Sequence, residues 1–457
     1  MVNLISGIDF LLLLIYSIVV FYCLKRFFFR SLNPAFTRLL VVFFSLKILA
    51  VLTYILLVVY YWQLADSVSV YSETKNFVSL ISADISNIKY LFLPVENYNA
   101  AINLDVSLKA VPGGSGMEGN FSLTRLCTIL YPLSLGKYLL LNFWFGVISA
   151  IAQFKLFLVL TKVYPQLKGK LAICILFIPT VLFYGSPIYK ETLCMSCLCL
   201  AGVCVYNVIK NRKPLINSLL VILFCFFIYL VKPYVLSAVL IATCIVLLSR
   251  FFARVFKHSL LGKAFSLILL GITIALIVKN ISYFDSYVYD FIDTANINQQ
   301  FYGYTIGENS SFEFGEIETS FSGLIKKIPL SIYTCYFRPN LWEINQPILL
   351  FCALESLTCF LLLCYTIVKK RRNFFMVLRS NILTHIIFIY VFLMGIIVGT
   401  TTFNFGSLMR YKVPAVPFLW LFIFILLYSD SDTASTPVAE NTDQTVSPDL
   451  NNQGTYQ

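Results

Sequence analysis

The sequence is poor in charge and in the short motifs on which many soluble enzymes depend. Only 12% of its 457 residues are charged, and only two are histidine, His258 and His385. It has no HExxH zinc motif, no GxSxG nucleophile motif and no glycine-rich phosphate loop. The scarcity of charge argues against a soluble fold, and the missing motifs argue against nucleotide hydrolysis and familiar soluble-enzyme chemistry.

Apolar residues are abundant instead. They make up 59% of the chain, and the mean hydropathy is +0.82. A membrane-spanning helix needs about 20 mostly apolar residues, and a helix satisfies its own backbone polar groups in lipid. The sequence therefore predicts an all-α, polytopic transmembrane bundle over residues 1–428. About eleven hydrophobic runs can be drawn, at residues 8–24, 39–62, 138–161, 171–188, 192–209, 214–231, 233–253, 260–278, 347–368, 382–402 and 413–428.

Lys and Arg are concentrated in alternate connections between these runs. The connection around residues 25–38 and every second one after it contain Lys and Arg but no Asp or Glu. Cytoplasmic loops retain such an excess of positive charge, so the pattern predicts an outside N-terminus and an inside C-terminus. The net charge of +12 then reflects topology and not binding to nucleic acid.

Two long outside segments interrupt the runs, at residues 63–137 and 279–346. Apolar residues at helical spacing predict helices lying along the membrane surface within 68–93 and 321–335. Segments of this length in compact proteins are usually functional or disordered. Residues 429–457 have few apolar residues and no Lys or Arg, which predicts a disordered cytoplasmic tail.

Most of the thirteen cysteines lie inside hydrophobic runs, where cysteine usually behaves as a small apolar residue. Cys194 and Cys197 form a CxxC pair, but with two histidines in the whole chain we expect no metal or redox site there. We assign no metal ligand, and a requirement for a divalent metal stays open. Cys127 and Cys335 are in outside segments, and whether they pair is also left open.

Asp66 is the first candidate for chemistry. It follows the second run, close to Trp62 and several tyrosines that include Tyr71. A carboxylate at the lipid boundary among aromatic rings would be partly desolvated, which suits a general base acting on a hydroxyl near neutral pH. The alternative is an interfacial aspartate that caps a surface helix.

The phrase FYGSPIYKETL joins the fourth and fifth runs through a short outside turn. Tyr189, Lys190 and Glu191 lie in this turn, where two charges cannot move far from the membrane. Prolines at 179 and 187 can leave backbone carbonyls free to bind a ligand. The alternative is a pair of snorkelling side chains that mark a helix end.

Four basic residues share the outside face: Lys232, Arg338, Arg410 and Lys412. A guanidinium pairs bidentately with phosphoryl oxygens, so such a group suits a phosphate-bearing substrate. The alternatives are contacts with phospholipid head groups and salt bridges with Glu343 and its neighbours. Two further charges, Lys47 and Glu355, lie within hydrophobic runs, and we do not place them in the site.

These features resemble the GT-C superfamily of integral membrane glycosyltransferases. The similarity rests on an acidic residue in the first large outside loop and on the phrase FYGSPIYKETL. The phrases RPNLWE and NFGSLMRYKVPAVPF are similar to bacterial envelope members of this type. The first large loop here follows the second run and not the first, and Asp66 has no adjacent acidic partner. Either a span has been added at the N-terminus or another residue takes the role of Asp66.

The resemblance implies transfer of a sugar from a polyprenyl-phosphate-linked donor to a glycan or lipid-linked acceptor, on the periplasmic face of the bacterial inner membrane. Asp66 would be the base, and Tyr71 and residues 189–191 would bind substrate. Charge considerations assign the lipid phosphate to Arg338, Arg410 and Lys412, with Lys232 beside it. An O-antigen polymerase or ligase is the alternative, and a lipid-linked oligosaccharide flippase or a structural scaffold fits less well.

Overall fold

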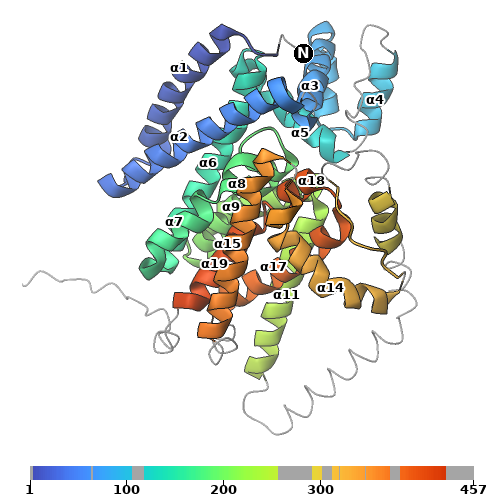
Figure 1. The fold of residues 1–457 in the computed structure, drawn as a ribbon. Helices are drawn as coiled ribbons and strands as arrows, with labels where there is room; N and C mark the ends of the chain where they lie inside the picture. The colour runs from blue at the N-terminus through green and yellow to red at the C-terminus, as the bar shows by residue number, and fades with distance from the viewer. Residues whose placement is uncertain are drawn as a thin grey trace, which may run out of the picture.

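A computed structural model describes residues 4–62, 65–104, 118–255, 291–300, 311–318, 320–344, 346–370 and 381–428. These residues are almost all in helices or in the short turns between them (Figure 1). Extended pairing among them is limited to an isolated antiparallel bridge between Ser311 and Asn404. The expectation of an all-α fold is confirmed for this part of the chain.

The first half of the chain contains these helices: α1 (Gly7–Cys23), α2 (Pro34–Leu57), α3 (Asp66–Ala83), α4 (Val95–Leu104), α5 (Glu118–Leu130), α6 (Tyr138–Val163), α7 (Lys168–Leu176), α8 (Pro179–Tyr184) and α9 (Lys190–Ile209). The second half contains these: α10 (Pro214–Val231), α11 (Pro233–Val255), α14 (Phe321–Phe337), α15 (Pro347–Lys369), α17 (Ile382–Thr401), α18 (Phe405–Tyr411) and α19 (Val416–Tyr428).

Eight helices of the described residues are long and apolar enough to cross a membrane, or nine if the bent pair α18 and α19 counts as one span. They are α1 and α2 with the π-helical turns that follow them, α6, α9, α10, α11, α15 and α17. Outward-facing leucines and isoleucines along α1 and α10 are exposed, as a surface in contact with lipid requires. The chain is a polytopic, all-α membrane protein.

Three of the eleven predicted runs need comment. The run at 171–188 is not one span, because it divides into α7 and α8 on either side of Phe177 and Ile178. Pro179 starts α8, which has six residues and a length of about 9 Å. The run at 413–428 contains α19, which meets α18 at 62°. The run at 260–278 and the predicted tail at 429–457 lie outside the described residues.

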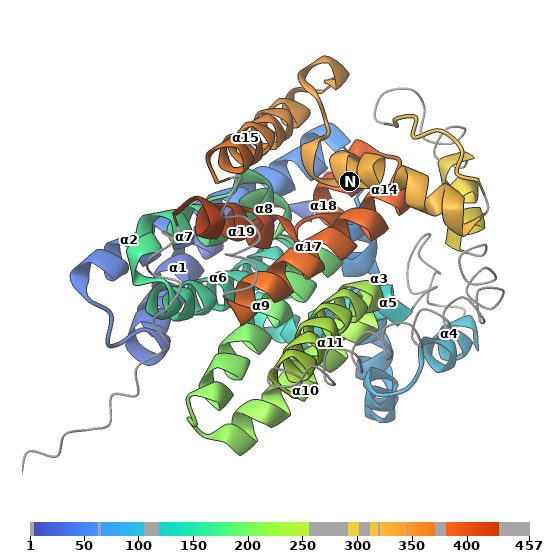
Figure 2. The ribbon, with the colours of Figure 1, turned by 90° about the horizontal axis from the view of Figure 1, so that it is seen from below.

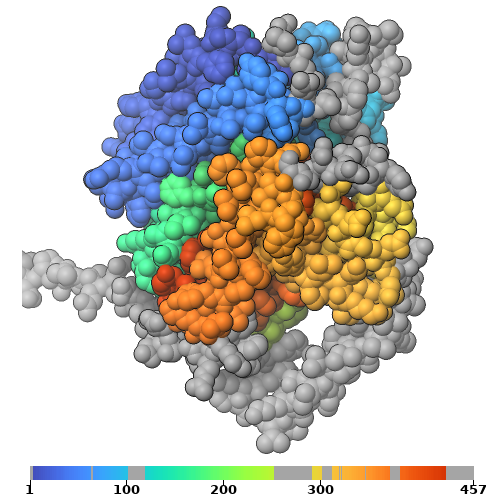
Figure 3. Space-filling view, in the orientation of Figure 1, coloured from blue at the N-terminus to red at the C-terminus, as the bar shows by residue number. Residues whose placement is uncertain are grey.

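Helix α6 lies at the centre of the bundle and has the most buried span. It packs against α1, α2, α7 and α9. Seen from below, α10 and α11 lie at one side of the molecule and α15 at the other, with α17 between them (Figure 2). In the space-filling view, α15 covers the middle of one face below α1 and α2 (Figure 3).

Close packing of α14 on α17 depends on small residues. A Cβ atom added to Gly399 would come within 1.9 Å of the backbone oxygen of Ser331, and one added to Gly395 would meet Tyr336. Glycine pairs of this spacing let helix backbones approach closely in membranes. A hydrogen bond of 2.9 Å between the hydroxyls of Ser331 and Thr400 joins the two helices. The helix predicted at 321–335 is present as α14.

Helices α3, α4 and α5 gather at one end of the bundle (Figure 1). The aromatic rings of Phe77, Tyr98 and Phe121 are fully buried and contact one another there. The helices predicted within 68–93 correspond to α3 and to the 3-10 helix Ile85–Leu91. This end of the bundle therefore has a small aromatic core of its own.

Candidate active site

Asp66 and Arg410, 344 residues apart in sequence, form an ion pair. Arg410 Nη1 donates to Asp66 Oδ2 at 2.7 Å. Asp66 is the first residue of α3, and Arg410 lies in the last turn of α18, whose N-cap Asn404 accepts from the backbone N–H of Ser407. The Asp66 side chain is 70% exposed and the Arg410 side chain 17%. The carboxylate of Asp66 is therefore at the surface, and the guanidinium of Arg410 lies mostly beneath it.

Tyr189 supports the guanidinium of Arg410 from the protein side. Its ring centroid is 4.8 Å from Arg410 Cζ, and its other neighbours include the ring of Tyr54 at 5.3 Å. A guanidinium over an aromatic face is held by cation–π attraction. Burial raises the pKa of the Tyr189 phenol, so the ring stays neutral at physiological pH.

Glu191 and Lys232 form a buried ion pair beside Arg410. Lys232 Nζ lies 2.7 Å from Glu191 Oε1, and the side chains are 5% and 3% exposed. The amine also donates to the Tyr234 hydroxyl at 2.9 Å and lies 3.8 Å from the centroid of the Tyr411 ring. Burial lowers the pKa of Lys232, but the Glu191 carboxylate and the neighbouring tyrosine hydroxyls together outweigh this and raise it, so the amine is protonated.

Lys190 completes this group of residues. It is partly exposed at the start of α9. Its amine interacts electrostatically with four charged residues, Lys232, Glu191, Asp66 and Arg410. We call Asp66, Tyr189, Lys190, Glu191, Lys232 and Arg410 the Asp66 cluster. The structure thus brings six of the nine predicted site residues together from four distant parts of the sequence.

Buried polar side chains hold the turn that carries residues 189–191. The Gly185 carbonyl accepts from Lys47 Nζ at 2.9 Å and from Ser149 Oγ at 2.6 Å. The Asn142 side chain accepts from the backbone N–H of Ile188 at 3.0 Å. Lys47 is fully buried and does not snorkel. A charge at this depth is costly unless it is bonded, so these contacts fix the turn against α2 and α6.

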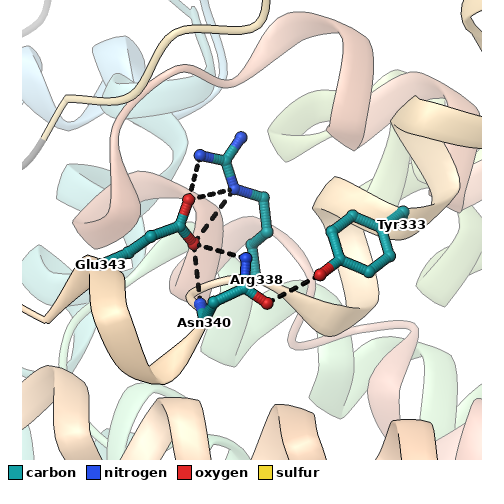
Figure 4. Close-up of polar contacts among 4 residues, drawn as sticks. All are labelled: Tyr333, Arg338, Asn340 and Glu343. Atoms are coloured by element: carbon teal, nitrogen blue, oxygen red, sulfur yellow. Dashed lines mark hydrogen bonds and ion pairs between the residues drawn. The ribbon is translucent and has the colours of Figure 1, made fainter.

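Arg338 belongs to a second cluster, shown in Figure 4. Its guanidinium binds the carboxylate of Glu343, which also accepts from the backbone N–H of Asn340 at 2.7 Å. Tyr333 donates to the Asn340 side chain at 2.7 Å (Figure 4). Arg338 Cζ lies 4.2 Å from the centroid of the Phe312 ring. Glu343 is therefore the partner of Arg338, as the salt-bridge alternative in the sequence indicated.

Lys412 extends the second cluster inside the protein. It is 1% exposed and donates to the Arg338 carbonyl and to Ser356 Oγ, each at 3.3 Å. The nearby carboxylate of Glu355 accepts from the backbone and hydroxyl of Thr180 at the start of α8. We call Arg338, Asn340, Glu343, Ser356 and Lys412 the Arg338 cluster. It joins α15 to the ends of α14 and α18.

Tyr71 lies apart from both clusters. Its hydroxyl donates to the Gly136 carbonyl at 2.7 Å, and its ring contacts that of Tyr138. Burial raises the pKa of Tyr71 to about 12, so it remains a hydrogen-bond donor. These contacts tie α3 to the turn before α6.

The surroundings of Asp66 differ from the expected aromatic ring. Tyr60 and Tyr61 are exposed, and Trp62 contacts Tyr54 and Phe183. Asp66 is itself mostly exposed, because it begins α3 at the surface. The partial desolvation expected from the sequence is therefore not present. The carboxylate instead forms an ion pair with the guanidinium of Arg410.

Sequence reasoning missed the aromatic partners Tyr234 and Tyr411 of Lys232. Tyr234 is two residues after Lys232, and Tyr411 lies between Arg410 and Lys412, so closeness in sequence to these basic residues was the available signal. Cys127 and Cys335 are free and buried, so they do not pair. Among the described residues, no group of three or more His, Cys, Asp or Glu side chains is placed to hold a metal ion.

Comparisons of the chain with protein-family models, with curated proteins and with solved structures found no match. A function for this chain is therefore inferred from the chemistry of the two clusters and from the resemblance noted in its sequence.

Proposed function

We propose that the protein is a membrane glycosyltransferase that moves a sugar from a polyprenyl-phosphate-linked donor to a glycan or lipid-linked acceptor. The proposed setting is the periplasmic face of a bacterial inner membrane, with the N-terminus in the periplasm and the C-terminus in the cytoplasm. The observation that carries the proposal is an exposed carboxylate, Asp66, in direct contact with a mostly buried guanidinium, Arg410. A base and a phosphate-binding cation are thereby adjacent.

In the proposed reaction Asp66 accepts the proton of an acceptor hydroxyl as that oxygen attacks the anomeric carbon of the donor sugar. The bond between the anomeric carbon and the phosphate oxygen breaks, and the polyprenyl phosphate leaves with the bonding electrons. Arg410 and the neighbouring Lys190 stabilise the negative charge that develops on the phosphate. Tyr189 holds the guanidinium in place from below.

Two of the other predicted residues support this site, and three have roles elsewhere in the protein. Glu191 and Lys232 bind each other and form a rigid, buried wall beside Arg410. Arg338 and Lys412 already have partners within the protein, so we do not assign them the lipid phosphate. Tyr71 donates to the Gly136 carbonyl, so we assign it to the packing of α3.

An O-antigen polymerase or ligase is the second candidate. The mostly buried guanidinium of Arg410, held over the ring of Tyr189, fits it as well, because an arginine can bind the phosphate of either kind of lipid-linked substrate. The products distinguish the two. Single repeat units accumulate in a deletion strain if the protein is a polymerase, whereas one sugar is missing from each unit if it is a transferase.

Replacement of Asp66 by Asn tests the proposed function. We expect glycan modification to fall by about 100-fold or more, because general base catalysis contributes at least that much. Envelope glycans from a deletion strain complemented with each variant provide the measurement. Asp84→Asn is the matched control: Asp84 ends α3, is exposed and loses the same charge. Full glycan modification by the Asp66→Asn protein, at normal membrane levels, would contradict the proposal.

A further inference from the structure

The Asp66–Arg410 ion pair is asymmetric. Arg410 is mostly buried, its Cζ lies over the rings of Tyr189 and Tyr411, and its Nε has no hydrogen-bond partner among the described residues. Asp66 is 70% exposed, and its carboxylate is bound by Arg410 through Oδ2. The cation is therefore fixed by the protein, while the carboxylate can turn into solvent by rotation of a short side chain.

The position of Asp66 coincides with the place where an anionic ligand of Arg410 would bind. A guanidinium offers two parallel N–H donors to a phosphate, and one of these donors, Nη1, is occupied by the carboxylate. Lys190 adds a second positive charge beside the pair. The phosphodiester of the donor carries one negative charge, as a carboxylate does. It can displace Asp66 because its two free oxygens can accept from both parallel donors of the guanidinium, whereas Asp66 is bonded to one of them.

We propose that Asp66 is a latch on an anion subsite formed by Arg410 and Lys190, and that the phosphate of a prenyl-phosphate lipid displaces its carboxylate. This inference rests on the proposed function for the identity of the ligand. Without the lipid, the carboxylate neutralises Arg410. When the phosphate binds, the carboxylate is released next to the donor sugar.

The latch has a consequence for the order of binding. Both oxygens of Asp66 are free of Arg410 only after the donor phosphate has taken the place of Oδ2 on the guanidinium. The donor therefore binds first, and an acceptor that arrives without a donor meets a carboxylate that is still paired. Coupling of this kind needs a difference in affinity between the two states, and the exchange of partners on Arg410 supplies it.

Binding of farnesyl phosphate to the full-length protein in detergent tests the latch. We expect Asp66→Asn to bind this probe about two- to fivefold more tightly than the unchanged protein, because the resting pair no longer has to be broken. Asp84→Asn should bind it with unchanged affinity. Equal or weaker binding by Asp66→Asn would overturn the latch, and so would equal tightening by Asp84→Asn.

Three further arms test which groups are involved. Farnesol lacks the phosphate, so Asp66→Asn should not change its affinity; tighter binding of farnesol would overturn the proposal. Inorganic phosphate should bind more weakly than farnesyl phosphate, and the reverse would reject a lipid as the ligand.

In an Arg410→Gln protein, Asp66→Asn should have no further effect on the affinity for farnesyl phosphate. Tightening in that background would indicate simple charge repulsion and reject the latch.

The outcomes also separate the latch from the proposed function. Loss of the glycan in Asp66→Asn with unchanged affinity for farnesyl phosphate keeps the glycosyltransferase assignment and rejects the latch. Tighter binding with a normal glycan keeps the latch and rejects Asp66 as the base.

Discussion

The Asp66 cluster and the Arg338 cluster each place an arginine against a carboxylate, yet the two arginines differ in what they can do. Arg338 is bound at several atoms by Glu343, and both side chains are mostly buried. Arg410 is bound at Nη1 by an acid that is 70% exposed. A cation whose partners are fixed inside the protein holds the fold together, whereas one with an exchangeable partner can receive a ligand.

Helix α18 makes the contrast sharp. Arg410 and Lys412 are two residues apart at its end, but Arg410 reaches α3 while Lys412 reaches the Arg338 carbonyl and Ser356. Residues two apart on a helical turn do not share a face, so the end of one short helix serves both clusters. We therefore expect replacement of Arg410 to reduce activity and replacement of Arg338 to reduce stability.

The largest expected effect is that of Arg410→Gln. Activity should fall by about 100-fold or more, as is typical when a group that stabilises developing charge is removed. The measurement is transfer of sugar by protein that elutes as a single species on gel filtration. Activity within about twofold of the unchanged protein, a negligible change in barrier height, would remove the distinction between the clusters.

Glu191→Gln should have the next largest effect, and on stability. It leaves the positive charge of Lys232 buried without its carboxylate, which costs about 3–5 kcal/mol. Thermal unfolding in detergent measures this. A double variant, Glu191→Leu with Lys232→Met, should recover much of the loss because both charges are removed. Full stability of Glu191→Gln would show that the pair is not needed to hold α9 beside the end of α10.

Arg338→Gln should have the smallest effect on chemistry. It removes the guanidinium that binds Glu343 and costs about 1–3 kcal/mol of stability, because the carboxylate keeps its bonds to Asn340 but loses its charge partner. Transfer per folded molecule should stay close to that of the unchanged protein. Loss of transfer at full stability would instead place Arg338 in the site and merge the two clusters.

Much of the bundle could be read from the sequence, since long apolar runs bounded by charge are determined by the needs of a helix in lipid. Helices α6, α9, α15 and α17 lie where such runs predict them. The run at 171–188 could not be divided in this way. Hydropathy records what is apolar and not where a chain turns, and Pro179 acts there as the first residue of a short helix.

The sequence predicted which residues share one face of the membrane. It did not predict which of them contact one another or which are buried. Lys190 and Glu191 are adjacent, yet Glu191 is buried against Lys232 while Lys190 is partly exposed. Tyr71 was selected for its closeness in sequence to Asp66, but the turn of α3 directs its hydroxyl to Gly136. Direction around a helix, and not distance along the chain, decided these differences.

By itself, the sequence determined that this protein is a helical membrane protein with its candidate polar residues between its spans. The cost of exposing backbone groups and charges to lipid leaves few other solutions. Only the tertiary structure decided which cations are satisfied and which are available. That choice depends on the partners that α3, α14, α15 and α18 bring to each side chain, over separations as large as the 344 residues between Asp66 and Arg410.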